Sequence, residues 1–298
     1  MCVGRACLHR SAKTLSTGDL LTRIPDAPMV SVVMAVRNGQ AYLRDAMDSI
    51  LSQTLADFEL IVVDDGSTDR TPDILEDYAR RDCRVRVLSQ APQGLSEALN
   101  RAISAARGKY IARMDADDVA LRERLARQVA FMETHPDVGL LGTAVCEVDP
   151  DGRPRAVFTM PGNDEQLRRA LIKFNPFFHS SVMIRRSVLE QVGLYSEEMR
   201  WAEDYDLWMR LARHTRLANL QEVLLKRRTE YGGSHSVRHE REQVRHALAI
   251  RWRAIRMGMY PITALPYLIR PVLMLVLPAS LRRSLRSWQR RRGRIVRT

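Results

Sequence analysis

The segment "RMDADDVALRERL", residues 113–125, carries three aspartates within four positions. Asp115 and Asp117 end a run typical of a strand, in which side chains two positions apart project to the same side. Carboxylates paired in this way suit Mg²⁺ or Mn²⁺, which usually keep water ligands and share the phosphates of a substrate. The alternative is an acidic helix start, where negative charge favours the positive end of the helix dipole. We expect Asp115 and Asp117 to hold a metal ion and Asp118 to start the next helix.

A second acidic pair lies in "WAEDYDLWMRLARH", which begins at residue 201. Leu207 and Trp208 give the predicted helix an apolar face, and Glu203 and Asp204 fall near its start. An acid at this place is most simply a helix cap. Opposite a bound metal, a carboxylate there could instead accept a proton from an attacking hydroxyl. Spacing alone leaves both interpretations open.

Four short runs rich in β-branched residues are predicted to be strands, at residues 29–36, 58–64, 84–88 and 109–115. Helical patterns lie between them, with apolar faces formed by Leu43, Ala46, Met47, Ile50 and Leu51 and by Leu95, Ala98, Leu99, Ala102, Ile103 and Ala106. Strands that alternate with helices of this length indicate an α/β fold with a mostly parallel sheet of right-handed βαβ units.

Polar residues cluster where three of these strands end: "RNGQ" after the first, "DDGSTDRTP" after the second and "DADD" after the fourth. In parallel sheets the ligand crevice lies beyond the carboxyl ends of the strands. The chain has no GxGxxG after its first strand and no GxxxxGK[ST], which argues against a dinucleotide-binding fold and a P-loop. The predicted ligand is therefore held by carboxylates and backbone, without a glycine-rich cradle.

Several segments in order resemble the family 2 inverting glycosyltransferases of the GT-A fold. They are "VSVVMAVRNGQAYLRDAMDSILSQTLADFELIVVDDGSTDRT", "GLSEALNRAISAARGKYIARMDADD", "HSSVMIRR" and "EDYDLWMRL", and they cover roughly residues 29–236. The resemblance implies a Rossmann-like, mixed but mostly parallel sheet flanked by helices. It also implies transfer of a sugar from a nucleotide diphosphate to an acceptor hydroxyl, in the synthesis of a cell-surface polysaccharide, a glycolipid or a lipid-linked saccharide.

The resemblance also assigns roles to single residues. It places the donor nucleotide against Ala35, Arg37, Asn38, Asp64 and Asp65. Asp115 is implied to lie nearer the ribose and Asp117 to bind the divalent ion, Mn²⁺ or Mg²⁺. Asp204 matches the general base, and Glu203 lies beside it. The implied reaction is a single in-line displacement that inverts the anomeric carbon, without a covalent sugar–enzyme intermediate.

Three further residues are candidates for contact with the acceptor or the diphosphate. His179 in "NPFFHSSVM" matches a histidine common in this branch of the family, although it could equally be a structural hydrogen-bonding residue. Many relatives carry tyrosine-arginine-x-histidine before a serine-rich loop. In this chain, "KRRTEYGGSHS" has Glu230 at the place of that histidine, and His235 follows five residues later. The sequence does not decide between Glu230, His235 and neither.

The net charge of +12 is concentrated at the C-terminus, because residues 281–298 hold eight arginines and no acid. A nucleic-acid-binding protein is the competing hypothesis from another class. The chain has no helix-turn-helix or zinc spacing, and Trp288 is the only aromatic residue of the tail. We therefore predict no nucleic-acid partner. A nucleotide-sugar-binding protein without catalysis is disfavoured because Asp204 occupies the position of the base.

The two ends of the chain differ from its centre. Residues 1–28 are polar and lack the apolar core of a secretory signal, so we expect a disordered extension. The four cysteines show no CxxC, which favours a reducing compartment.

The C-terminal region, 237–298, is expected to be helical and basic. Residues 257–281 carry one charge, Arg270, and four prolines, which favours an element lying on an anionic membrane surface over a membrane span. The alternative is a buried helical pair followed by a solvated tail. We thus predict a catalytic domain at 29–236, with a nucleotide-binding half (29–118) and an acceptor half (119–236), in a cytoplasmic protein peripheral to the inner face of the cell membrane.

Overall fold

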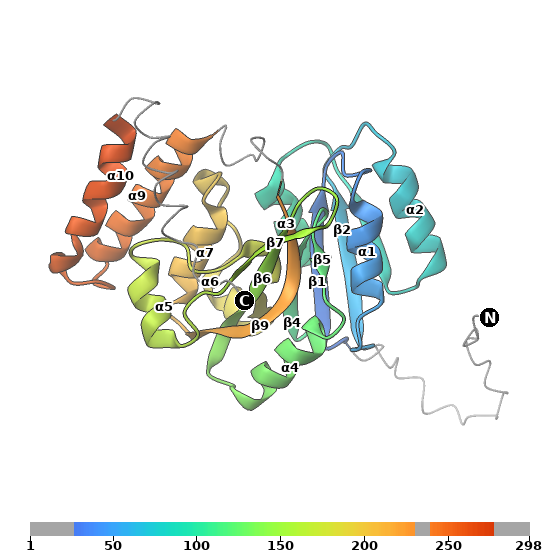
Figure 1. Ribbon diagram of the computed structural model, residues 1–298, viewed down its shortest axis with the longest axis horizontal. Helices are drawn as coiled ribbons and strands as arrows, with labels where there is room; N and C mark the ends of the chain where they lie inside the picture. Colours follow the sequence, from blue (N-terminus) through green and yellow to red (C-terminus); the bar gives the residue numbers. More distant parts are fainter. Residues whose placement is uncertain (1–26, 230–238, 277–298) are drawn as a thin grey trace, which may run out of the picture.

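The computed structural model of the protein describes residues 27–229 and 239–276, which form one mixed sheet of nine strands flanked by helices (Figure 1). The strand order is β3-β2-β1-β4-β8-β6-β9-β5, and β7 pairs with β6. Nearly all of the predicted N-terminal extension lies outside the described residues, as do Glu230, His235 and the arginine tail.

The first half of the sheet consists of the four strands that the sequence predicts. They are β1 (Val30–Val36), β2 (Phe58–Asp64), β3 (Val85–Ser89) and β4 (Tyr110–Asp115), and all four run parallel. Every residue of β2 is buried, as expected for a parallel strand covered on both faces. In the register, Ala35 lies opposite Asp115 and Val36 lies opposite Asp64. The carboxyl ends of β1, β2 and β4 therefore meet at one edge.

The second half of the sheet makes the fold mixed. Its strands are β5 (Val119–Ala120), β6 (Val138–Val148), β7 (Pro154–Phe158), β8 (Met183–Arg185) and β9 (Arg216–Arg228). Strand β8 is antiparallel to both β4 and β6, whereas β9 is parallel to β6 and antiparallel to β5. Because β9 pairs with β5, the end of β9 returns to the turn that carries the three aspartates.

Helices cover both faces of the sheet. One apolar cluster joins the sheet to α1 (Leu43–Leu51), α2 (Thr71–Arg81) and α4 (Arg124–Thr134). The cluster on the other face joins it to α3 (Leu95–Ser104), α5 (Asp164–Leu171), α6 (Arg186–Val192), α7 (Glu203–Leu211) and α9 (Glu240–Arg256). Trp208 of α7 is fully buried in this second cluster. Truncating such a residue to alanine costs about 3–5 kcal/mol of stability, so α7 is firmly held.

The structure corrects the predicted position of Asp118. The next long helix, α4, begins at Arg124, and the chain after Asp118 first forms the short strand β5. Asp118 is 2% exposed, and its carboxylate accepts hydrogen bonds from the Ser180 hydroxyl and from the backbone N–H of Arg228. These tertiary contacts, and not a helix dipole, determine where Asp118 lies.

The C-terminal helices form a hairpin at one end of the molecule (Figure 1). Ile250 and Ala254 of α9 are buried in the same cluster as Trp208 of α7, and α10 (Pro266–Val276) packs against α9. Of the helices in residues 27–229 and 239–276, none has the length and apolar character needed to cross a membrane. The predicted domain boundary at residues 236–237 falls in the segment that is not described.

Candidate active site

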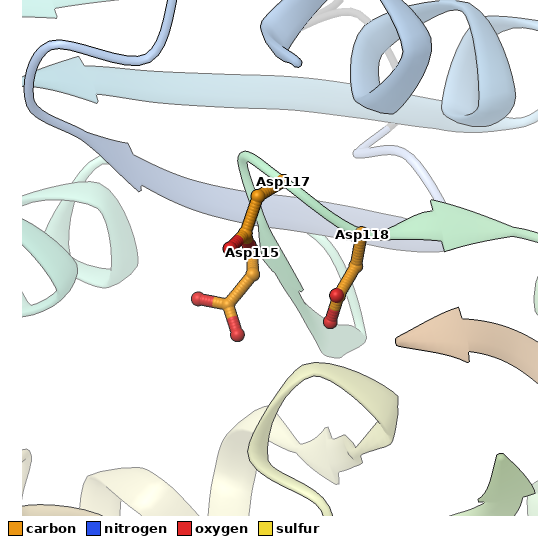
Figure 2. Close-up of side chains that lie close together, drawn as sticks. All are labelled: Asp115, Asp117 and Asp118. Carbon is orange, nitrogen blue, oxygen red and sulfur yellow. The ribbon is translucent and has the colours of Figure 1, made fainter. Parts of the chain in front are cut away.

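Three aspartate carboxylates gather at the end of β4, on one side of the turn that leads to β5 (Figure 2). Oxygen atoms of Asp115, Asp117 and Asp118 all lie within 4.8 Å of one another. Asp115 is partly buried, Asp117 reaches solvent and Asp118 is buried. The structure thus brings together the two predicted metal ligands and adds Asp118, which the sequence analysis had assigned to a helix start.

The surroundings of Asp117 and Asp118 disfavour the ionised form of each carboxyl group. Although the Asp117 side chain reaches solvent, desolvation by the surrounding protein and the charge of Asp115 raise its pKa to about 6. Desolvation, together with the charges of Asp115 and Asp117, raises the pKa of Asp118 to about 7. A divalent cation would remove this repulsion, and clustered carboxylate oxygens are the ligands that Mg²⁺ and Mn²⁺ prefer. The residues present therefore fit a divalent metal ion.

Arg113 is a buried cation beside this cluster. Its side chain is 3% exposed and forms an ion pair with Asp115, two positions further along β4. Burial opposes the charge of Arg113, but the negative charges led by Asp115 outweigh it and raise the pKa of the guanidinium. Its positive charge also acts to lower the pKa of Glu203 and of Asp204. Arg113 thus links the aspartate cluster electrostatically to the acidic pair on α7.

The loops after β1 and β2 are tied together at the same edge of the sheet. The backbone N–H of Asn38 donates to the Ser67 hydroxyl at 2.9 Å, and the Asn38 side-chain oxygen accepts from the Thr68 N–H at 2.8 Å. Asn38 has a positive φ of 53°, a conformation that asparagine tolerates better than most residues. Arg37 beside it is exposed. These contacts hold "RNGQ" and "DDGST" in one arrangement.

The two aspartates after β2 differ in their hydrogen bonding. Asp64 accepts from the Ser67 N–H at 3.0 Å. Asp65 is 5% exposed and accepts from the Gln90 amide and from the backbone N–H groups of Gln93 and Gly94, at 2.8–2.9 Å. Asp65 therefore fixes the backbone that enters α3.

The acidic pair predicted near a helix start occupies the first turn of α7. The Asp204 carboxylate accepts from the Asn175 side chain at 2.7 Å and from the Tyr205 N–H at 2.6 Å. Burial raises the pKa of Asp204, whereas these two donors and Arg113 oppose the shift. Desolvation and the charge of Asp204 raise the pKa of Glu203 to about 7. A carboxylate held in this way, with a raised pKa, is suited to general-base chemistry near neutral pH.

His179 lies in the short 3₁₀ helix His179–Ser181. Its Nε2 lies 2.8 Å from the Tyr195 hydroxyl oxygen, and its ring packs edge-on against Trp208. Burial, reinforced by the charge of Arg113, holds the pKa of His179 well below its usual range, so the ring is neutral. These contacts favour the structural interpretation of His179. Glu230 and His235 lie outside the described residues.

Four residues of this site were missed by sequence reasoning. Arg113 had a usable signal, because it lies two positions before Asp115 on a strand and so shares its face. The contacts of Asn175, Ser180 and Asp118 depend on tertiary structure and had no local signal.

Comparison with known proteins identifies the family. The model for glycosyl transferase family 2 matches residues 31–193, more than half of the chain. The chain belongs to this family. EpsE of Bacillus subtilis is 33% identical over 258 residues, covering 85% of this chain and 91% of EpsE. The O-antigen biosynthesis glycosyltransferase WbnJ of Escherichia coli is 34% identical over 204 residues, covering 67% of this chain and 79% of WbnJ.

Solved structures of other proteins share this architecture. The mannosyltransferase PcManGT of Pyrobaculum calidifontis, in complex with GDP-Man and Mn²⁺, superposes with a TM-score of 0.62 at 22% identity, over 84% of this chain and 71% of that chain. S. aureus TarS gives a TM-score of 0.59 at 22% identity over 74% of this chain, which spans only 39% of that longer protein. The predicted GT-A fold and the prediction of a glycosyltransferase are confirmed.

Proposed function

We propose that this glycosyltransferase transfers a sugar from a nucleoside diphosphate to an acceptor hydroxyl, with inversion of the anomeric carbon. The observation that carries the proposal is the pairing of two acidic groups around Arg113: the aspartate cluster at the end of β4 and the Glu203–Asp204 pair on α7. One group is suited to a metal-bound diphosphate and the other to removal of a proton.

The donor side of the site lies at the carboxyl ends of β1, β2 and β4. Residues 29–118 form the nucleotide-binding half, in which the nucleotide lies against Ala35, Arg37, Asn38, Asp64 and Asp65. Asp117 and Asp115, together with Asp118, would hold the divalent ion, Mn²⁺ or Mg²⁺. When bound, this ion supplies positive charge that stabilises the departing diphosphate. The Mn²⁺ and GDP-Man bound to PcManGT support this arrangement.

The acceptor side is built by residues 119–236. The oxygen of the acceptor hydroxyl attacks the anomeric carbon, and the Asp204 carboxylate takes the proton that this hydroxyl loses. A bond from that oxygen to the carbon forms, and the bond from the carbon to the diphosphate oxygen breaks on the opposite face. Glu203 sets the charge around Asp204. The relative WbnJ is an O-antigen biosynthesis glycosyltransferase, which supports a saccharide or lipid-linked saccharide as the acceptor.

A screen of nucleotide sugars tests this function. We expect the enzyme to turn over one of them in the presence of Mn²⁺ or Mg²⁺, and EDTA to abolish this turnover. NMR should show that the product has the inverted anomeric configuration. Asp117→Ala should lose this turnover, whereas Asp73→Asn, at an exposed aspartate on α2, should keep it. Full metal-dependent turnover in Asp117→Ala would refute the assignment of the metal ligands.

We also propose that the C-terminal region, 237–298, associates with an anionic membrane surface, which would place the enzyme on the inner face of the cell membrane. Ile262, Ile269 and Leu273 are 74%, 57% and 51% exposed on the α9–α10 hairpin. The sequence holds no acidic residue between Gln243 and Val276, and the arginine tail follows. Apolar side chains beside basic ones are the features that bind anionic lipid surfaces.

Vesicle co-sedimentation tests this association. The protein should pellet with vesicles containing phosphatidylglycerol and stay in the supernatant with pure phosphatidylcholine vesicles. Ile269→Glu and Leu273→Glu should weaken binding, because they place charge on the exposed apolar face. Val157→Glu, at an exposed apolar residue of β7, is the matched control and should bind normally. Equal binding by all three variants would argue against this surface.

A further inference from the structure

The Asp204 carboxylate is held by two segments, α7 and the chain after α5. The Asn175 amide donates to it from the second segment, and the Tyr205 N–H donates to it from the next residue of α7. The Tyr205 hydroxyl in turn donates to the backbone carbonyl of Leu171, the last residue of α5, and so connects α7 to the point where the second segment begins. The position of Asp204 therefore depends on how these segments are fixed to each other.

Helix α9 supplies a guanidinium that bridges both segments. Arg251 is 9% exposed. Its Nε donates to the Tyr205 hydroxyl at 3.0 Å and its Nη2 donates to the Lys173 carbonyl at 2.7 Å. Tyr205 is the neighbour of Asp204, and Lys173 lies two residues before Asn175. One buried side chain thus contacts each of the segments that hold the carboxylate.

The rest of α9 strengthens this connection. Arg253 forms an ion pair with Asp206, which is 1% exposed and is also paired with Arg210 of α7. Ile250 is fully buried against the α7 side of the core. Ion pairing and apolar packing on either side of Arg251 therefore hold α9 against α7. Both helices lie C-terminal to the segment matched by the family model, residues 31–193.

We propose that Arg251 is a positioning residue for the general base, acting through Tyr205 and the Lys173–Asn175 segment. This inference rests on the proposed role of Asp204. The arrangement needs arginine, because its planar fork donates in several fixed directions at once, whereas a lysine ammonium is a compact point charge on a flexible stem. Small displacements of a base reduce catalysis strongly, by about a hundredfold for a shift near 1 Å.

The charged and polar groups around Asp204 determine how its pKa would change if the Lys173–Asn175 segment moved. Glu203 lies beside it on α7, Arg113 acts on it from β4, and Asn175 and the Tyr205 N–H donate to it. Tyr195 also lies within electrostatic range. If the Lys173–Asn175 segment relaxes, the donor most directly lost is Asn175, which favours the ionised carboxylate.

Kinetics of full-length variants test the proposal. We expect Arg251→Gln to lower kcat by about tenfold to a hundredfold, leaving the KM for the nucleotide sugar and the affinity for Mn²⁺ near those of the wild type. The acidic limb of its pH–kcat profile should move to higher pH. Arg251→Lys should recover only part of kcat, and Tyr205→Phe should lower kcat without adding fully to Arg251→Gln in the double variant. Arg241→Gln, at an exposed arginine in the first turn of α9, should behave as the wild type.

Two results would overturn the inference. One is a wild-type kcat and pH profile in both Arg251→Gln and Tyr205→Phe while Asp204→Asn is inactive. The other is a parallel loss of Mn²⁺ affinity and kcat, which would mean a general loss of folding. An active Asp204→Asn variant would instead refute the proposed base itself, so the two failures are distinguishable.

Discussion

Glu203 and Asp204 share the first turn of α7, and the negative charge of Asp204 raises the pKa of Glu203. Two carboxyl groups coupled in this way titrate as a pair. The base must be ionised to accept a proton, and the pKa of Asp204 is raised. Activity should therefore disappear as the pH falls through a value above the usual range of an aspartate.

Glu203→Gln removes one negative charge from this pair. The ionised form of Asp204 then becomes easier to reach, so its pKa should fall. We expect the acidic limb of the kcat/KM profile to move to lower pH in this variant. A limb that stays in place or moves upward would show that Glu203 does not control the charge of the base.

Asn175→Ala removes a hydrogen bond that favours the ionised Asp204. The pKa of Asp204 should rise, and the acidic limb should move to higher pH, opposite to the effect of Glu203→Gln. Gln166→Ala, at an exposed glutamine near the start of α5, serves as a control because its side chain is not a donor in either hydrogen bond to Asp204. Shifts of the same sign in the Asn175 and Glu203 variants would contradict the electrostatic description.

We expect removal of α9 to reduce stability and turnover more than removal of α10 does. A chain that ends after residue 256 keeps α9 and its contacts with α7, so it should retain its catalytic fold and turnover and lose vesicle binding. A chain that ends after residue 238 exposes the surface covered by Ile250 and Ala254 and removes Arg251 and Arg253. Deleting one such buried aliphatic residue alone costs about 2–5 kcal/mol.

Thermal melts and turnover of the two truncated chains check this difference. The longer one should melt close to the full-length protein, and the shorter one should melt at a clearly lower temperature with little turnover. Equal stability of the two chains would mean that α9 does not contribute to the core.

The elements that could be predicted from sequence are those with strong local patterns. Strands β1, β2 and β4 are largely apolar and almost fully buried, and the polar residues after them mark the carboxyl edge of a parallel sheet. Asp118 could not be placed, because its partners Ser180 and Arg228 are 62 and 110 residues away in the sequence. The contacts of Arg251 could not be predicted either, because Tyr205 and Lys173 are 46 and 78 residues away in the sequence. Local patterns do not show which distant carbonyl a buried arginine will reach.

The whole molecule combines a catalytic sheet with a basic end. Much of its net charge of +12 belongs to the arginine tail. If the tail and the α9–α10 hairpin bind anionic lipid together, binding should weaken as salt rises from about 0.05 M to 0.5 M, because the screening length shortens. Co-sedimentation with vesicles at several salt concentrations measures this dependence. Binding that does not change with salt would mean that apolar contacts, and not the basic residues, bind the membrane.

The central claim is that Asp204 removes the acceptor proton at a metal-dependent site. The most direct test is the kcat of Asp204→Asn, measured with the identified donor and acceptor alongside donor and Mn²⁺ binding. Asparagine keeps the shape of the side chain and cannot accept the proton. We predict a fall in kcat of about 10²–10⁴-fold with donor and Mn²⁺ affinities unchanged. A kcat equal to that of the wild type would contradict the account.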